Sequence, residues 1–418
     1  MDFDLPQDLA DYLAELDDFI EREIQPLQEA DDNQRFFDHR REWARTDFER
    51  GGLPREEWEA LLAEARRRAD VAGHLRFALP REYGGRDGSN LWMAVIREHL
   101  AAKGLGLHND LQTEHSIVAN HPFVLIFRDF GTPEQQAEFI PGMLDHRTHR
   151  VSFGLTEPAH GSDATHMDTV AVRETRNGVP GFRIDGEKMW ITGMHVASHC
   201  AVFARTSGKA GDARGISCLL VPRDTPGLVI EEYLWTFNMP TDHPRISFRN
   251  VWVPESALLG KLDEGLAIAQ HFVHENRIRQ AASSLGAASY CIAQSIEYAR
   301  ERKPFGKPLA ANQAIQFPLA QIKAKLELCR LMTYKAAWLF DRGRPCGNEA
   351  NIAKLTGAQV AFEAADQAFQ TLGGMAYSKE YPVERMFRDA RIAKNIPVAE
   401  QLVLAHIGTS MLGLPRSY

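Results

Sequence analysis

Apolar residues recur at helical spacing through most of the first 150 residues of the chain. The first such run consists of Leu9, Tyr12, Leu13, Leu16, Phe19 and Ile20. Residues three or four positions apart lie on one face of a helix, so this run predicts an amphipathic helix. The same spacing predicts further helices over 57–68, through Ile96 and Leu100, and over 123–130.

Two stretches interrupt this helical pattern. Residues 79–85, rich in Gly and Pro, predict a turn. Residues 35–52 are unusually charged and are expected to form a surface helix or an insertion. Taken together, residues 1–150 are predicted to form an N-terminal helical domain.

The pattern changes between residues 151 and 260. Short runs of alternating apolar and polar residues predict strands, and turn residues separate them at short intervals. Asn177-Gly178 and Asp185-Gly186 are both sequences that favour a tight hairpin turn. We therefore expect a middle antiparallel β-domain, either a sandwich or a barrel, over 151–260.

Long helical patterns return over 261–418. Few helix breakers occur there, and the clearest are Gly343-Arg-Pro345, which is expected to end one helix, and Leu372-Gly-Gly374, which interrupts another. The order helical, β, helical predicts the α+β class, with a β-domain inserted between the halves of a helical bundle.

Composition narrows the classes of function. The 418 residues carry a net charge of −8, which argues against a nucleic-acid partner, and no apolar run is long enough to span a membrane. The acidic N-terminus lacks the apolar segment of an export signal. The odd number of cysteines, without metal-type spacing, is typical of reduced thiols. We expect a cytoplasmic protein.

Known metal and nucleotide patterns are missing from the sequence. It contains neither the His-Glu-x-x-His pattern of zinc hydrolases nor paired cysteines, and we expect no metal site. A Gly-x-Gly-x-x-Gly pattern after a strand is also missing, which argues against a Rossmann nucleotide site.

Two segments of the β-region carry residues suited to a flavin. In the loop 153–163, backbone amides and the hydroxyls of Thr156 and Ser162 could bind a pyrimidine edge and a phosphate. Further along, Trp190 could form a wall against an isoalloxazine ring, with Thr192 donating near its N5 atom. Alone, each segment also fits an ordinary loop or strand end.

Two segments of the C-terminal region offer further groups. Arg302 could bind a pyrophosphate with two parallel hydrogen bonds, and Phe305 could stack on an adenine. The run from Gln370 to Gly374 offers a backbone that a phosphate could approach closely, because glycine has no side chain in the way.

These segments together resemble the acyl-CoA dehydrogenase family over nearly the whole chain. The resemblance is carried by Phe130–Gln135, Leu155–Pro158, Trp190–Thr192, Arg302–Lys307, Gly373-Gly374, Tyr381–Arg385 and Arg388–Lys394, which occur in family order. It implies an N-terminal helical domain, a middle β-domain and a C-terminal four-helix bundle, with FAD between the last two. It also implies a homodimer or homotetramer, because the family's counterparts of Arg302 and Phe305 reach the FAD of a neighbouring subunit. An electron-transfer flavoprotein is the implied electron acceptor.

The resemblance assigns two sets of binding residues. For FAD they are Phe153, Leu155, Thr156, Gly161, Ser162, Trp190, Thr192, Arg302, Phe305, Leu309, Gln313, Gln370, Gly373 and Gly374. For the acyl-CoA substrate they are Ser162, His274 and Arg277.

The family reaction needs a carboxylate base that this sequence does not place in the usual positions. The base removes an α-proton while the β-hydrogen leaves as hydride to flavin N5, and its own backbone N–H helps to polarise the thioester carbonyl. At the commoner position an ungapped comparison puts Pro397, which has neither a carboxylate nor an N–H. Glu400 could move into that place, or could simply sit at a helix N-terminus, where the helix dipole favours it.

The second family position for the base holds Asn276. Glu275 is one residue away, about 100° around a helix, and could serve if the helix is rotated or overwound. Otherwise Glu275 is expected to face solvent or an ion-pair partner. His274 stands where many family members have an aspartate near CoA.

Two functions are therefore expected from the sequence. The first is FAD-dependent α,β-dehydrogenation of an acyl-CoA with Glu275 or Glu400 as the base. The alternative is a flavin-binding homologue without α-proton abstraction. Such a homologue would be a partner subunit of a hetero-oligomer, or an enzyme of the same fold that reacts with oxygen or a substrate without CoA.

Overall fold

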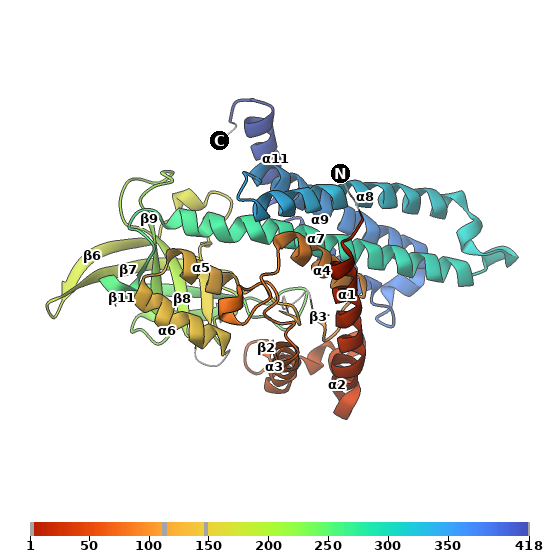
Figure 1. Cartoon of the computed structure of the whole chain (residues 1–418), viewed down its shortest axis with the longest axis horizontal. Helices are drawn as coiled ribbons and strands as arrows, with labels where there is room; N and C mark the ends of the chain where they lie inside the picture. Colours follow the sequence, from red (N-terminus) through yellow and green to blue (C-terminus); the bar gives the residue numbers. More distant parts are fainter. Residues whose placement is uncertain (1–3, 111–114, 146–148, 417–418) are drawn as a thin grey trace. The chain divides into compact units, whose positions relative to one another are not determined.

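The computed structural model describes residues 4–110, 115–145 and 149–416, and they divide into two compact units. The helical unit comprises Met1–Ala44, Glu56–Asn120 and His274–Tyr418, and the sheet unit comprises Arg45–Arg55 and His121–Val273. Figure 1 shows the chain with its elements labelled. The prediction that the N-terminus carries no export signal concerns, among others, residues 1–3, which lie outside the described residues.

The N-terminal part of the helical unit is formed by helices whose apolar faces share one core. They are α1 (Gln7–Phe19), α2 (Gln25–Glu29), α3 (Glu56–Val71) and α4 (Asn90–Ala102), and the short strands β3 (Asn109–Asp110) and β4 (His115–Ser116) follow them. Leu9, Tyr12 and Leu16 of α1 are buried, as the spacing predicts. The Ser89 hydroxyl caps α4 by accepting a hydrogen bond from the Trp92 amide.

Helices of very different length form the C-terminal part of the helical unit (Figure 1). They are α8 (Gln313–Asp341), α9 (Gly347–Leu372), α10 (Val383–Ala393), α11 (Glu400–His406) and the part of α7 (Gly265–Glu301) that begins at His274. Small residues let α7 and α9 approach closely, because a Cβ on Gly357 would lie 3.3 Å from the Cα of Ala281. The helix ends predicted near Gly343 and at Leu372 are confirmed.

An eight-stranded sheet is the core of the sheet unit, with strand order β10-β11-β7-β6-β8-β9-β12 and β5 beside β8. The strands are β5 (Val151–Gly154), β6 (Val170–Arg176), β7 (Val179–Met189), β8 (His199–Arg205), β9 (Ile216–Pro222), β10 (Leu228–Tyr233), β11 (Pro244–Pro254) and β12 (Leu258–Leu259). Most pairs are antiparallel, but β5 runs parallel to β8. The helices α5 (Pro122–Phe130) and α6 (Pro133–Leu144) precede the sheet.

The two predicted hairpin turns have different outcomes. Asn177-Gly178 forms the β6–β7 turn with positive φ at both residues, as predicted. The turn predicted at Asp185-Gly186 is wrong, because both residues lie inside β7. Gly186 is needed there for close packing: a Cβ on it would lie 2.5 Å from the Thr169 hydroxyl oxygen.

The charged stretch 35–52 does not form the surface helix that was one of its two expected structures. It contains 3₁₀ turns and the strand β1 (Thr46–Asp47), which pairs with β2 (Leu53–Pro54). This hairpin belongs to the sheet unit, where Trp235 Nε1 donates to the Gly51 carbonyl at 3.0 Å. Residues 45–55 are therefore held by hydrogen bonds to the β1–β2 backbone rather than by helical packing.

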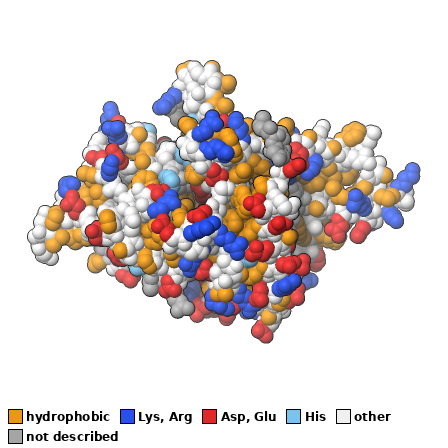
Figure 2. Space-filling model, viewed as in Figure 1, with side chains coloured by type: hydrophobic (Ala, Val, Ile, Leu, Met, Phe, Trp, Pro, Cys, Tyr) orange, Lys and Arg blue, Asp and Glu red, His pale blue; other side chains and the backbone are white. Residues whose placement is uncertain are grey.

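Charged side chains of both signs are interspersed on the face drawn in Figure 2. Among the described residues, no helix is both long and apolar enough to cross a membrane. The exact domain boundaries at 150 and 260 stay a prediction.

Candidate active site

The segment after β7 presents Trp190 and Thr192 at the surface of the sheet unit. Trp190 is 48% exposed and has a positive φ of 63°, a conformation that bulky residues rarely adopt. Backbone hydrogen bonds fix the residues on either side of Thr192: the Ile191 amide donates to the Pro244 carbonyl at 3.3 Å, and the Gly193 amide donates to the Asp242 carbonyl at 3.0 Å. A strained, exposed aromatic residue held this firmly is typical of a binding site.

His243 lies beside these two residues, and sequence reasoning missed it. Its Nδ1 is 3.2 Å from the Thr192 hydroxyl oxygen and 2.9 Å from an Asp242 carboxylate oxygen. Its ring meets the Trp190 ring edge-to-face at 6.2 Å. No local sequence pattern could have shown this, because His243 comes from a loop 51 residues further along the chain.

A buried ion pair supports the loop that follows β5. Lys188 Nζ donates to Glu157 at 2.8 Å and to the Leu155 carbonyl at 3.0 Å, and the Glu157 carboxylate also accepts from the Asp168 and Thr169 amides. Burial lowers the pKa of Lys188. Burial also opposes ionisation of Glu157, but the charge and hydrogen bond of Lys188 outweigh it and hold the pKa of Glu157 below its usual value.

The same loop leaves several donors unused. Gly161 and Ser162 are exposed, and within the described chain neither the Thr156 nor the Ser162 hydroxyl forms a hydrogen bond. A Cβ on Gly161 would meet nothing within 4 Å, so its backbone is open to a ligand. Phe153 has a different position, since its ring stacks on Phe272 at 4.6 Å and is not exposed.

The four predicted FAD-binding residues at the α7–α8 connection lie in the helical unit. Arg302, Phe305 and Gln313 are exposed, and the part of the chain that the structure describes supplies no hydrogen bond or ion pair to their side chains. Phe305 is fully exposed and has a positive φ of 55°. The Leu309 amide donates to the Arg302 carbonyl at 2.7 Å and closes this connection.

The end of α9 offers the second predicted segment of this unit. Gln370, Gly373 and Gly374 are exposed. Gly373 has a positive φ of 59°, and a Cβ on either glycine would meet nothing within 4 Å. The backbone there is therefore open, as a phosphate site requires.

Glu275 has one engaged and one unengaged oxygen. Its Oε1 accepts a hydrogen bond from Asn120 Nδ2 at 2.6 Å, and Asn120 Oδ1 in turn accepts from Arg97 at 2.6 Å. The other oxygen, Oε2, is buried and has no hydrogen-bond partner among the described residues. The alternative in which Glu275 faces solvent or an ion pair is therefore wrong, because Asn120 holds the carboxylate within the helical unit.

Glu400 is engaged through both oxygens. Oε1 accepts from Gln359 at 2.6 Å, and Oε2 lies 3.3 Å from Lys394 Nζ. Burial raises the pKa of Glu400, but the Gln359 hydrogen bond and the Lys394 charge outweigh it and hold that pKa below its usual value. Glu400 is also the first residue of α11, and Pro397 lies in the segment just before it.

The two predicted substrate residues of α7 lie near the start of α9. A Cβ on Gly347 would approach His274 Cε1 to 3.4 Å. Arg277 is largely buried; its Nε has no hydrogen-bond partner in the described residues, and burial lowers its pKa. Ser162, the third predicted substrate residue, belongs to the sheet unit.

One group in the described residues has the spacing of metal ligands. Ligand atoms of Glu157, His160 and Asp168 lie within 4.8 Å of one another. Lys188 already neutralises Glu157, and His160 pairs with Asp163 at 2.7 Å. The hydrogen bond that His160 donates to the Asp163 carboxylate raises the pKa of His160. These pairs give the group an internal explanation without a metal ion.

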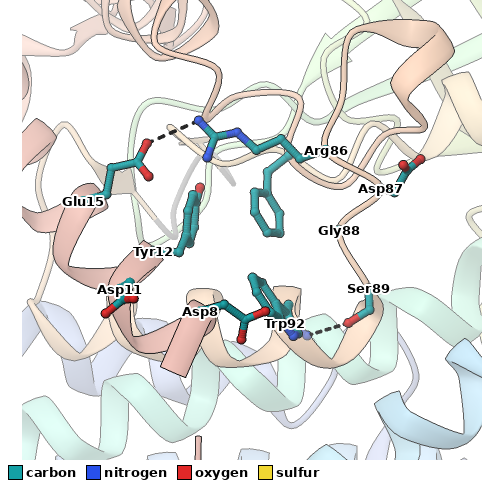
Figure 3. A pocket seen from close by; sticks show the side chains of 10 residues that line it. Asp8, Asp11, Tyr12, Glu15, Arg86, Asp87, Gly88, Ser89 and Trp92 are labelled. Atoms are coloured by element: carbon teal, nitrogen blue, oxygen red, sulfur yellow. Dashed lines mark hydrogen bonds and ion pairs between the residues drawn. The ribbon is translucent and has the colours of Figure 1, made fainter. Parts of the chain in front are cut away.

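A surface pocket of about 590 Å³ in the helical unit contains none of the predicted site residues. Figure 3 shows acidic side chains of α1 facing Arg86 and Trp92 across it, with Arg86 paired to Glu15 at 3.3 Å. The Tyr12 hydroxyl at its floor is 3.2 Å from His74 Nδ1. Arg86 and Glu15 thus pair within the pocket, and its remaining charged lining residues, Asp8, Asp11 and Asp87, are acidic.

Comparison with known proteins assigns the chain to a family. Sequence models of the acyl-CoA dehydrogenase N-terminal, middle and C-terminal domains match residues 7–147, 152–251 and 263–396. The chain belongs to the acyl-CoA dehydrogenase family. It is 34% identical to an acyl-CoA dehydrogenase of Bacillus subtilis over 344 residues, which cover 82% of this chain and 87% of the relative.

Solved structures agree with the family assignment. Butyryl-CoA dehydrogenase from Megasphaera elsdenii is 29% identical, with a TM-score of 0.81 over 99% of this chain and all of that one. A chain described with the electron transferring flavoprotein of Acidaminococcus fermentans is 28% identical, with a TM-score of 0.77 over 99% of this chain and all of that one. The predicted α+β fold with its three parts is confirmed.

As an acyl-CoA dehydrogenase relative, the protein is an FAD-dependent oxidoreductase. The residues fit the cofactor: within the described parts of the chain, the hydroxyls of Thr156 and Ser162 in the sheet unit and the side chains of Arg302 and Phe305 in the helical unit have no hydrogen-bond or ion-pair partner, and the Gly161 backbone is open. The family match ends at residue 396, directly before Pro397.

Proposed function

We propose that this protein oxidises an acyl-CoA thioester between Cα and Cβ, with Glu275 as the general base. The observation that supports the proposal most is the hydrogen bonding of the two Glu275 carboxylate oxygens. One oxygen is held by Asn120 and the other is buried without a partner among the described residues, so it is available to accept a proton.

The proposed reaction removes one proton and one hydride from the acyl chain. Glu275 takes a proton from Cα, the β-hydrogen leaves with its electron pair, and a Cα–Cβ double bond forms. FAD supplies the acceptor for that hydride at N5. Asn120 fixes the orientation of the carboxylate, and Arg97 fixes Asn120. A base positioned in this way contributes typically 10²–10⁴-fold to the rate.

Glu400 is less suited to this role, although it is the other predicted base. Both of its oxygens are engaged, by Gln359 and by Lys394. A carboxylate in this state must lose a hydrogen bond or an ion pair before it can accept a proton. We assign Glu400 to the support of the segment between α10 and α11.

The remaining cofactor residues divide between the two units. In the sheet unit, the loop 153–163 would bind FAD through the unused hydroxyls, with Trp190 against the ring and Thr192 near N5. In the helical unit, Arg302, Phe305, Leu309 and Gln313, together with Gln370, Gly373 and Gly374, would bind phosphates and adenine. Stacking of a base on an aromatic side chain contributes about 1–3 kcal/mol.

We further infer a homodimer or homotetramer. Phe305 is fully exposed, as expected for a side chain that completes the FAD site of a second copy. An apolar stripe on α8 adds support, since Phe317, Leu328, Leu331 and Trp338 are exposed at coiled-coil spacing. Leu331→Glu should shift the protein to a smaller species in analytical ultracentrifugation, whereas an unchanged mass would count against this surface.

Two finer assignments complete the proposal. An electron-transfer flavoprotein is the proposed electron acceptor, supported by the similar chain described with the flavoprotein of Acidaminococcus fermentans. A cytoplasmic location is proposed from the reduced cysteines, all of which are buried.

The second candidate function is a flavin-binding homologue without α-proton abstraction. Asn276 and Pro397 favour it, because both family positions for the base lack a carboxylate. In this case the protein would act as a partner subunit, or would use oxygen or a substrate without CoA.

Anaerobic flavin reduction separates the two functions. Purified protein with FAD is mixed with a panel of acyl-CoA thioesters, and bleaching of the oxidised-flavin absorbance band is followed. The proposed function predicts bleaching by at least one thioester, and slowing by ~10³-fold in Glu275→Gln but not in Glu400→Gln. Protein that carries FAD and is inert to the whole panel would establish the second function instead.

A further inference from the structure

His243 contacts both of the side chains that the proposed function places beside the flavin ring. Its Nδ1 lies 3.2 Å from the Thr192 hydroxyl oxygen, and its ring meets the Trp190 ring edge-to-face at 6.2 Å. The His243 side chain is half-buried, whereas Trp190 and Thr192 are exposed. The imidazole therefore supports the two exposed side chains from the protein side.

The backbone fixes the contact between His243 and Thr192. Two backbone hydrogen bonds join their segments, from the amides on either side of Thr192 to the carbonyls on either side of His243. Ser152 Oγ also donates to the Thr192 carbonyl at 2.9 Å, and the Ser152 side chain is buried. A hydroxyl and an imidazole held in this way form a preformed arrangement within the sheet unit.

Asp242 determines which ring nitrogen of His243 carries a hydrogen. One oxygen of its carboxylate lies 2.9 Å from Nδ1, a distance short enough for a hydrogen bond. An ionised carboxylate only accepts hydrogen bonds, so an Nδ1 without a hydrogen would face a second acceptor and be repelled by it. The hydrogen therefore belongs on Nδ1, in the neutral and in the charged imidazole alike.

A hydrogen on Nδ1 fixes the direction of the hydrogen bonds of the Thr192 hydroxyl. A hydroxyl has one hydrogen to donate and two lone pairs that accept. Because Nδ1–H is a donor, the Thr192 oxygen accepts from it and shares this hydrogen with the Asp242 carboxylate. Among the described residues His243 is the only hydrogen-bond partner of the Thr192 hydroxyl. The hydroxyl hydrogen is therefore kept away from His243 and stays available to a ligand.

We propose that His243 is a positioning residue for the flavin: held by Asp242, its Nδ1–H group commits the Thr192 hydroxyl to donate its hydrogen to N5 of bound FAD. This inference rests on the proposed function, which places Thr192 near N5. The N5 atom of oxidised flavin has a lone pair and no hydrogen, so it accepts this hydrogen bond. The same imidazole holds the Trp190 ring through the edge-to-face contact, so both groups at the flavin depend on one residue.

The first test observes the flavin directly and needs no substrate. The wild type, Thr192→Val, His243→Leu and the double variant are saturated with FAD, and resonance Raman spectroscopy measures the stretching band of the flavin C4a–N5 bond. A hydrogen bond at N5 changes the frequency of this band. We expect both single variants to shift the band in the same direction and the double variant to match Thr192→Val, because the two changes disrupt one hydrogen bond.

Three results would overturn the inference. An unchanged band in His243→Leu, beside a shifted band in Thr192→Val, would mean that the hydroxyl needs no support from the imidazole. Shifts that add in the double variant would mean that His243 acts on the flavin independently of Thr192. An unchanged band in Thr192→Val would also remove Thr192 from N5, whereas the proposed oxidation would stand as long as a thioester reduces the wild-type flavin.

Flavin reduction by an acyl-CoA gives a second readout. Thr192→Val should slow it by ~100-fold and His243→Leu by about tenfold or more, since a preorganised donor contributes about 10²–10³-fold. His243→Asn, whose amide N–H replaces Nδ1–H, should restore most of the rate and the wild-type band. A loss that His243→Asn does not repair would reflect packing and contradict the inference. The matched control is His149→Leu, since His149 is a half-buried histidine of the sheet unit, 3.9 Å from the Glu138 carboxylate, and both readouts should stay unchanged.

Asp242→Leu provides an independent variant if His243→Leu fails to bind FAD. Without the carboxylate, Nδ1 of a neutral imidazole can accept from the Thr192 hydroxyl, so the band should move towards that of Thr192→Val. A wild-type band in Asp242→Leu would show that Asp242 and His243 do not direct the hydroxyl. If no acyl-CoA reduces the wild-type flavin, the proposed oxidation fails, and the Raman comparison still decides the role of His243.

Discussion

Two regions of the molecule are assigned to the same reaction and differ in how exposed their side chains are. The segment around Trp190 and Thr192 lies within the middle-domain match and is exposed, and the only partner of these two side chains among the described residues is His243. The region around Glu275 and Arg277 is half-buried, and Glu275 Oε2 and Arg277 Nε have no hydrogen-bond partner among the described residues. The comparison teaches that the two regions can be tested separately, one through FAD retention and the other through flavin reduction.

The largest expected effect on stability tests the support of the flavin loop. Lys188→Met would leave the buried Glu157 carboxylate without its counter-charge, so we expect a loss of about 3–5 kcal/mol in the free energy of unfolding, measured by urea denaturation. Arg173→Met is the control, because its pair with Glu255 is exposed and should contribute less than ~1 kcal/mol. Similar losses for both variants would refute the structural role of the ion pair.

Phe305 provides the next test on the cofactor side. Phe305→Ala should weaken FAD binding by about tenfold or more, because a stacking partner of the adenine is lost. Its melting temperature without FAD should stay unchanged, since the side chain is fully exposed. Ultrafiltration of the holoprotein measures the released FAD, and retention equal to the wild type would contradict the assignment of Phe305.

On the base side, Asn120→Leu removes the donor that orients Glu275. We expect flavin reduction to slow by about 10–100-fold while the KM for the thioester stays nearly constant, because Asn120 positions the base rather than the substrate. Stopped-flow kinetics at several substrate concentrations gives both values. A rise in KM at constant rate would place Asn120 in substrate binding instead.

The smallest effect concerns the pH dependence of stability. Below its pKa of about 8, Lys354 is charged in the folded protein and its burial is unfavourable, whereas above that pH it becomes neutral. Lys354→Met should therefore raise the melting temperature by a few degrees near neutral pH, and by less towards pH ~10. Calorimetry checks the trend, and an advantage that grew with pH would contradict a lowered pKa of Lys354.

The parts of the fold that follow local rules could be predicted from the sequence. The spacing of Leu9, Tyr12 and Leu16 predicted a helix and its buried face, and Asn177-Gly178 predicted a turn. The turn predicted at Asp185-Gly186 was wrong because Gly186 is required for close packing against Thr169. A local sequence pattern cannot show such a tertiary contact.

The residues of the candidate site also differ in whether a local sequence pattern could predict them. Trp190 and Thr192 could be found because their family pattern is contiguous, but His243 joins them only through a tertiary contact. The engagement of Glu275 depends on Asn120, which lies 155 residues away in the sequence. The choice between Glu275 and Glu400 therefore required the structure.

Exchange of the substrate α-proton is the most direct test of Glu275 as the base. An acyl-CoA that reduces the flavin is incubated anaerobically in D₂O with wild-type protein, Glu275→Gln or Glu400→Gln, and deuterium at Cα is followed by NMR. We predict that Glu275→Gln loses exchange by ~10³-fold and that Glu400→Gln keeps it within about tenfold of the wild type. Wild-type exchange in Glu275→Gln, with FAD still bound, would contradict the account.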